Sequence, residues 1–316
     1  MSKSFDFRRA RPWEVALTAF ALAAPLLLPL TANGDSGFIR KAVAQEMQQV
    51  DTSKLVSIGG ALTEIIYALG EEGRLVARDS TSMYPEAAMQ LPDVGYMRAL
   101  SPEGVIAVNP TAILAVEGSG PADALAVLKS AGIPFETVPE GYDRAAILEK
   151  IDIVGKFLGV PEKAKELEAK VGAELDAAVA EAAKTPDAQR KRVLFVLSFQ
   201  GGRVMAAGNK TAADGIIGLA GGINATDGTF EGYKPITDEA IVNAKPDVIM
   251  VMLRGGQGST DEEILAHPAI SVTPAAASKT VLRMDGQHLL GFGPRTASAI
   301  TDLNKKLYGK AGNVSQ

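Results

Sequence analysis

Short apolar runs alternate with amphipathic stretches in two separate parts of the chain. In the first part, the pattern predicts strands over residues 55–58, 74–78, 112–116 and 135–138, with helices over 63–70, 102–109 and 122–131. The second part begins with an apolar strand over 193–197 and continues with a helix over 214–220 and a strand over 247–251. Strands that alternate with helices at this spacing predict mainly parallel sheets covered on both faces.

The middle of the chain, residues 144–184, has helical periodicity and no strand pattern. Gly159, Val160 and Pro161 interrupt it, and residues 161–183 then run on as Ala, Glu, Lys and Leu with few other types. A helix of this length would span roughly 35 Å. A solvated surface helix is the simpler interpretation. Its place between two similar halves favours a connecting spine instead.

The two halves repeat one another in outline. The segment 64–70 resembles 214–220, and Ser-Pro-Glu at 101–103 resembles Thr-Asp-Glu at 237–239. In both halves a proline follows that glutamate by seven residues and precedes an apolar strand. We therefore predict an α/β protein with two Rossmann-like lobes joined by a long rigid helix, and ligands favour the cleft between such lobes. The predicted boundaries are 45–142 for the first lobe, 143–184 for the spine and 185–316 for the second lobe.

The N-terminus has the pattern of an export signal. Three arginines within residues 8–11 precede an apolar run over 15–30, and Ala-Val-Ala follows at 42–44. This pattern predicts a signal peptide over residues 1–44, and the paired arginines also fit twin-arginine export. A membrane anchor is the alternative, but the run has sixteen residues, includes two prolines and is short for a bilayer.

Composition narrows the classes of partner and the compartment. Without residues 1–44 the chain keeps 26 basic and 34 acidic residues, a net charge of −8, which disfavours a nucleic-acid partner. Cysteine is absent, so disulfides, thiolate metal sites and a lipid-modified cysteine are excluded. We expect an exported, soluble, monomeric protein in the periplasm of a Gram-negative bacterium.

The most informative stretch runs from residue 78 to 100 and contains Tyr84. Pro85 favours an extended backbone at Tyr84, so the tyrosine is expected in a loop that follows a strand. Tyrosinate is a known protein ligand of haem iron. A half-buried surface tyrosine is the structural alternative.

Other loops expected to face the cleft carry aromatic and cationic residues. A large, flat, apolar ligand with acidic edges suits this mixture, because rings pack on aromatics and carboxylates pair with Arg or Lys. Four methionines could line the same space, although core positions are more usual for them. The candidate binding residues beside Tyr84 are Tyr96, Arg98, Phe199, Gln200, Tyr233, Lys234, Arg254 and Phe292.

Signatures of catalysis are absent from the sequence. It contains no G-x-S-x-G elbow, P-loop, H-E-x-x-H or dinucleotide fingerprint. The two histidines, His267 and His288, are isolated, have no third partner, and are expected in structural roles. A carrier of bare zinc or manganese is therefore not expected. We expect a binding protein, with an enzyme on a two-lobed α/β scaffold as the alternative from another class.

Two groups of motifs carry a resemblance to a known family. They are DSTSMYP with VGYMRALSPEGV, and VLFVLSFQGGRVMAAGNKTAADGIIGLAGG with FEGYKPIT. With these motifs the chain, from Leu55 to Tyr308, resembles the periplasmic haem-binding proteins of bacterial haem ABC importers. They belong to a superfamily of helix-hinged binding proteins that also carries cobalamin and ferric siderophores, and these ligands are the alternatives to haem.

The resemblance assigns roles to particular residues. Tyr84 falls on the family's axial tyrosine, and Glu64 and Asp214 fall on the acidic residues, one per lobe, that dock on the importer's permease. Ordinary solvated helix acids are the competing interpretation of these two. Some members hold a second haem with a histidine of the second lobe. Residues 198–201 offer none, so one haem per chain is expected.

A mechanism follows as a hypothesis. Tyr84 would bind the ferric iron of haem b as a phenolate, with Arg98 as the nearby cation that favours the charged form. Lys234 or Arg254 would meet the propionates. The partners implied by the resemblance are an inner-membrane permease with its ATPase and, upstream, an outer-membrane haem receptor.

Overall fold

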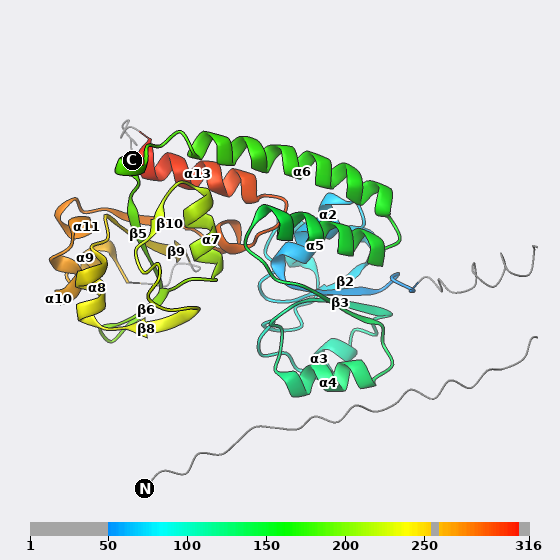
Figure 1. Cartoon of the computed structure of the whole chain (residues 1–316). Coiled ribbons are helices and arrows are strands. Elements are labelled where there is room, and N and C mark those ends of the chain that lie inside the picture. The colour runs from blue at the N-terminus through cyan, green and yellow to red at the C-terminus, as the bar shows by residue number, and fades with distance from the viewer. Residues whose placement is uncertain (1–49, 254–258, 310–316) are drawn as a thin grey trace, which may run out of the picture. The chain divides into compact units, whose positions relative to one another are not determined.

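The structure is a computed structural model, and it describes residues 50–253 and 259–309 (Figure 1). The expected signal peptide over 1–44 and the candidate residue Arg254 lie outside the described residues. The lobe boundaries expected at residues 142 and 184 stay predictions.

The first lobe is built on a parallel sheet of four strands. The strand order is β2-β1-β3-β4, with β3 next to both β1 and β4. Strands β1 and β3 are buried over their whole lengths, as the continuous apolar runs predict. The four strands are β1 (Leu55–Ile58), β2 (Leu75–Arg78), β3 (Ala112–Val116) and β4 (Phe135–Val138).

Helices cover both faces of this sheet because alternate strand residues point to opposite sides. Leu114 packs in a cluster with helices α2 and α5, while its neighbours Ile113 and Ala115 pack in a second cluster with α3 and α4. Figure 1 shows α3 and α4 together on one side of β3. The four helices are α2 (Gly60–Ala68), α3 (Pro102–Ile106), α4 (Ala122–Ser130) and α5 (Arg144–Phe157).

The second lobe contains a mixed sheet with strand order β10-β9-β5-β6-β8, and β7 pairs with the start of β5. Strands β9 and β10 run parallel to β5 or to each other, but β6 is antiparallel to both β5 and β8. The strands are β5 (Arg192–Gln200), β6 (Arg203–Ala207), β7 (Ile223–Asn224), β8 (Tyr233–Ile236), β9 (Val248–Leu253) and β10 (Val281–Asp285).

This antiparallel part corrects the positions expected for four candidate binding residues. Phe199 and Gln200 end strand β5 instead of lying in a loop, and Tyr233 and Lys234 begin strand β8. The pairing places Tyr233 opposite Ala207 of β6.

Short helices complete the second lobe, and the start of α8 repeats the start of α3. Ser101 accepts a hydrogen bond from the Gly104 amide at 3.3 Å, and Thr237 accepts one from the Ala240 amide at 3.2 Å. Both are N-cap bonds, which satisfy a free amide in the first turn of each helix. The helices are α7 (Ala212–Leu219), α8 (Asp238–Ala244), α9 (Asp261–Leu265), α10 (Pro268–Ser271), α11 (Pro274–Ala277), α12 (Gly286–Leu290) and α13 (Thr296–Tyr308).

The long helix α6 (Pro161–Ala182) follows α5 and packs against both α5 and α13 (Figure 1). One apolar cluster extends from the first sheet through α5 and α6 to α7, α13 and the second sheet. The two-lobed α/β architecture that the repeat indicated is confirmed. Within residues 50–253 and 259–309, no helix has the length and apolar character needed to cross a membrane.

Two helical glycines provide a test of how tightly the spine is packed. A Cβ added at Gly155 of α5 would lie 2.2 Å from the Ala164 Cβ, whereas one added at Gly218 of α7 would meet nothing within 4 Å. We expect Gly155→Ala to lower the free energy of unfolding by about 1–3 kcal/mol through overpacking. The matched Gly218→Ala should raise it by about 0.5–1 kcal/mol. Urea unfolding measures both, and equal effects would contradict close contact between α5 and α6.

Candidate functional site

A buried polar network holds the loop that carries Tyr84. The Asp79 carboxylate, which is fully buried, accepts hydrogen bonds from the Gly59 amide at 2.9 Å, the Ser82 hydroxyl at 2.7 Å and the Thr81 amide at 3.0 Å. The Ser82 hydroxyl also lies 2.7 Å from that of Thr63 on α2. Because each of these polar groups has a partner, the network fixes the loop on the first lobe.

Tyr84 itself lies at the surface, with 45% of the residue exposed. It follows the fixed part of the loop and precedes a short 3₁₀ helix over Glu86–Gln90. The guanidinium of Arg295, from the start of α13, lies over the Tyr84 ring with its carbon 3.5 Å from the ring centroid. Arg295 is therefore a cation beside Tyr84 that the sequence did not indicate, and the role expected for Arg98 stays a prediction.

Glu64 lies in the interior of the protein, where it pairs with the same arginine. Its carboxylate receives Arg295 Nη2 at 2.6 Å and Nε at 3.0 Å, and Gln287 Nε2 at 2.8 Å. Only 5% of Glu64 is exposed. A carboxylate with three internal donors does not face a partner protein, so the docking role expected for Glu64 does not fit this structure.

Asp214, the other expected docking residue, also serves its own lobe. It lies in the first turn of α7, where it accepts hydrogen bonds from the Lys210 amide at 3.1 Å and from the Asn224 side chain at 2.9 Å. These bonds are typical of a carboxylate that stabilises a helix N-terminus. The docking role of Asp214 stays a prediction.

A second group of residues forms around Arg98. Arg98 is exposed, and its charge acts on the phenols of Tyr142 and Tyr233. Burial raises the pKa of Tyr142 to about 12, and the Glu140 carboxylate adds to this shift. Burial also raises the pKa of Tyr233. Both phenols are therefore neutral at physiological pH and offer ring faces together with a hydroxyl.

Aromatic contacts extend this second group. The rings of Tyr142 and Phe292 meet edge to face with centroids 5.2 Å apart, and those of Tyr233 and Phe195 with centroids 6.3 Å apart. Phe292 is almost fully buried, so it supports Tyr142 and does not face a ligand as expected.

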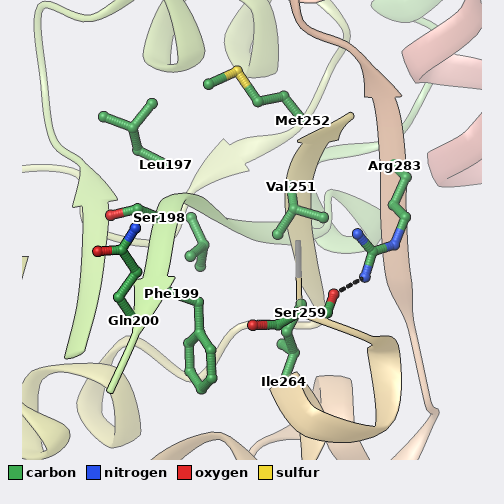
Figure 2. A pocket seen from close by; sticks show the side chains of 10 residues that line it. Leu197, Ser198, Phe199, Gln200, Val251, Met252, Ser259, Ile264 and Arg283 are labelled. Carbon is green, nitrogen blue, oxygen red and sulfur yellow. Dashed lines mark hydrogen bonds between the residues drawn. The ribbon is translucent and has the colours of Figure 1, made fainter. Parts of the chain in front are cut away.

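Phe199 and Gln200 line a separate cavity in the second lobe (Figure 2). At about 130 Å³ this cavity is smaller than the sites that enclose drug-sized ligands, which begin at about 300 Å³. The Arg283 side chain at its rim donates a hydrogen bond to the Ser259 carbonyl at 2.7 Å. The cavity alone does not hold a porphyrin.

The remaining candidates are dispersed. Tyr96 is exposed in a turn two residues before Arg98, and Lys234 is exposed on β8. The two histidines have the structural roles that the sequence indicated. His267 caps α10 by accepting from the Ala269 amide at 3.3 Å, and His288 lies 3.1 Å from Asp302. In the part of the chain that the structure describes, no group of three potential metal ligands comes together.

Three residues of the site were not found by sequence reasoning: Arg295, Gln287 and Tyr142. Arg295 stands 211 residues after Tyr84, and no local pattern connects the two. A weak sequence signal pointed to Gln287: Gly286 and Gly291 flank its segment and suggest a close approach of the backbone to another part of the protein. Tyr142 follows Gly141 after a predicted strand, which is a usual place for a binding residue in an α/β lobe.

The sequence from residue 55 to 288 matches the family model described as periplasmic binding protein. The chain belongs to the periplasmic binding protein family. The family and its relatives here are substrate-binding transport proteins, and the periplasmic location follows from the family.

Several solved structures of periplasmic heme-binding proteins have the same fold as this chain. One of them, the periplasmic heme-binding protein BhuT in complex with two hemes, is 39% identical in sequence. The match covers 80% of this chain and 97% of BhuT, with a TM-score of 0.75.

Two curated relatives are more distant. The uncharacterized ABC transporter substrate-binding lipoprotein YvrC of Bacillus subtilis is 28% identical over 82% of this chain and 81% of its own length. A vitamin B12-binding protein of Yersinia pestis is 27% identical over 66% of this chain and 71% of its own length.

The pKa of Tyr142 predicts how the stability of this binding protein responds to alkaline pH. The unfolded phenol ionises at about pH 10, whereas burial raises the pKa of the native phenol to about 12. The native state therefore loses the contribution of Tyr142 as the pH rises through this window. In urea unfolding at pH 9 and pH 11, Tyr142→Phe should gain stability relative to the wild type at the higher pH. A constant difference between the two proteins would contradict the raised pKa.

Proposed function

We propose that this protein captures ferric haem where its two lobes meet, through the phenolate of Tyr84, and delivers it to an inner-membrane ABC importer. The observation that carries the proposal is the likeness to BhuT, a heme-binding protein that is 39% identical over almost its entire length. Tyr84 supports it chemically, because its exposed ring follows a loop fixed by the buried Asp79.

A phenolate oxygen suits ferric iron. A phenol normally ionises at about pH 10, but a ferric ion bound to the oxygen stabilises the deprotonated form. An anionic oxygen donor prefers ferric to ferrous iron, so reduction of the iron would loosen the ligand.

The chemical character of the other candidate residues suits a porphyrin. Tyr142 and Tyr233 supply neutral aromatic surface, and Arg98 supplies a cation that a propionate can pair with. Lys234 and Arg254 stay further proposals for the propionates. We propose one haem per chain, because His267 and His288 are both engaged in internal contacts. The solved BhuT complex holds two hemes, so haemin titration to saturation decides the stoichiometry.

The role of the Tyr84 oxygen can be tested with Tyr84→Phe, which keeps the ring beneath Arg295 and removes only the ligand atom. We expect the affinity for haemin to fall roughly a hundredfold, or about 2.8 kcal/mol. The phenolate-to-iron charge-transfer band should disappear. Absorption titration with haemin measures both, with Tyr84→Ala as the second variant. An unchanged band in Tyr84→Phe would remove Tyr84 from the iron site.

Cobalamin is the second candidate, favoured by the match to the vitamin B12-binding protein. It predicts that cyanocobalamin binds tightly and that Tyr84→Phe leaves this binding unchanged. Parallel calorimetric titrations of the wild type with haemin and with cyanocobalamin separate the two functions.

Contact with a permease is proposed at the two helix starts that the internal repeat relates. Glu103 of α3 and Glu239 of α8 hold equivalent positions, and both are exposed. Three residues after each glutamate comes an exposed apolar side chain, Ile106 (38% exposed) or Val242 (40%). Each lobe thus presents one carboxylate next to one apolar side chain. This outward pair suits docking better than the internally bonded Glu64.

The docking proposal predicts that Glu103→Lys combined with Glu239→Lys leaves haemin affinity unchanged and abolishes uptake by the cognate importer. Reversed charges would repel basic pockets on the permease. Haemin uptake into proteoliposomes that contain the importer measures the effect. Glu166→Lys with Glu262→Lys, an exposed pair with the same change in charge, is the control. Normal uptake by the first double variant would refute the docking surface.

A further inference from the structure

Arg295 connects the segment before α13, which belongs to the second lobe's part of the chain, to helix α2 of the first lobe. Its guanidinium forms a two-point pair with Glu64, through Nη2–Oε1 at 2.6 Å and Nε–Oε2 at 3.0 Å. Both side chains are shielded, with 25% of the Arg295 side chain and 5% of the Glu64 side chain exposed. A planar guanidinium held at two points cannot rotate freely, so Glu64 fixes its plane.

The fixed guanidinium lies on the face of the Tyr84 ring, 3.5 Å from the centroid. This is well inside the range of a cation–π contact, about 6 Å. Contact on the face leaves the phenol oxygen, at the edge of the ring, free of Arg295. The geometry therefore restrains the ring without occupying the atom that would bind iron.

Gln287 braces the same loop from α12. Its Nε2 donates to Glu64 Oε1 at 2.8 Å, and its Oε1 accepts a hydrogen bond from the Met83 amide at 2.8 Å. A Cβ added at Gly60 would lie 2.9 Å from Gln287 Nε2, so glycine is needed there for this approach. One carboxylate thus holds the ring of Tyr84 through Arg295 and the backbone before it through Gln287.

We propose that Arg295 and Gln287 are positioning residues for Tyr84, supplied by the opposite lobe and anchored on Glu64. They hold the phenol in the orientation that binds the iron, so that the ligand atom from one lobe depends on the other lobe. This inference rests on the proposed haem-binding function. If Arg295 and Gln287 are positioning residues, their effect on haemin binding must act through Tyr84.

A double-mutant cycle with haemin tests this dependence. Arg295→Lys keeps a positive charge for Glu64 but loses the planar, two-point contact. We expect it to weaken haemin binding about tenfold, the scale of a shielded cation–π contact, and to shift the charge-transfer band. In the Tyr84→Phe background the same substitution should change the affinity little. An equal loss with and without the Tyr84 oxygen, or an unchanged band, would overturn the proposal.

Further variants guard against simple misfolding. Gln287→Ala removes the brace and leaves the Glu64–Arg295 pair, so it should weaken haemin binding severalfold while unfolding remains cooperative. Arg283→Lys is the matched control, because Arg283 pairs with Asp261 elsewhere in the second lobe. It should leave both haemin affinity and the band unchanged.

A measurement without haem separates this inference from the proposed function. In protein with isotope-labelled tyrosine, the Tyr84 ring signal, assigned by its loss in Tyr84→Phe, should shift in Arg295→Lys and stay in place in Arg283→Lys. An unshifted Tyr84 signal would overturn the positioning role. Failure of the wild type to bind haemin, with the shift present, would instead overturn the proposed function alone.

Discussion

The shielded ion pair between Glu64 and Arg295 is the interaction on which the site depends. Two charges removed from water carry a desolvation cost that their attraction offsets only when the geometry is good and other polar atoms are satisfied. Both conditions are met, since the pair is two-pointed and Gln287 adds a third donor to the carboxylate. Such a pair contributes little net stability but specifies one arrangement. Here it specifies how the segment before α13 sits on α2.

The long helix explains why this arrangement can be maintained. Helix α6 packs against α5 and α13, and one continuous apolar cluster includes residues of both sheets. Relative rotation of the lobes would disturb this packing along most of the helix, so only small movements are inexpensive. A contact such as Arg295 on Tyr84, which tolerates little displacement, is compatible with a spine of this kind.

Much of the fold was predictable because its strands are short, apolar and separated by glycine or proline. Strands β1, β3 and β4 have the bounds that the pattern predicted, and α6 starts at Pro161 as expected. The antiparallel strands β6 and β8 were missed. The Gly201-Gly202 turn indicates a hairpin after β5. Pro235 argues against a strand over β8, but β8 is an edge strand, where a missing amide is tolerated.

The site was less predictable because its contacts are tertiary. Tyr84 stands out through the adjacent Pro85, and its exposure agrees with the loop that was expected. Nothing near Tyr84 indicates Arg295, since the two meet only after both lobes have folded. Arg98, the cation put forward from the sequence, acts on the phenols of Tyr142 and Tyr233. The sequence therefore indicated the loop that carries Tyr84, but not the cation that packs on its ring.

The internal repeat relates two pairs of acidic residues, and their exposure distinguishes the two pairs. Glu64 and Asp214 hold equivalent positions in the repeat, and both accept hydrogen bonds from their own chain. Glu103 and Glu239 are equivalent as well, and both remain at the surface. A repeat arises from shared architecture, so equivalence alone cannot distinguish a residue that stabilises a lobe from one that meets a partner. An acid at the surface of both lobes can meet a partner that contacts both lobes at once, which is why docking is proposed at Glu103 and Glu239.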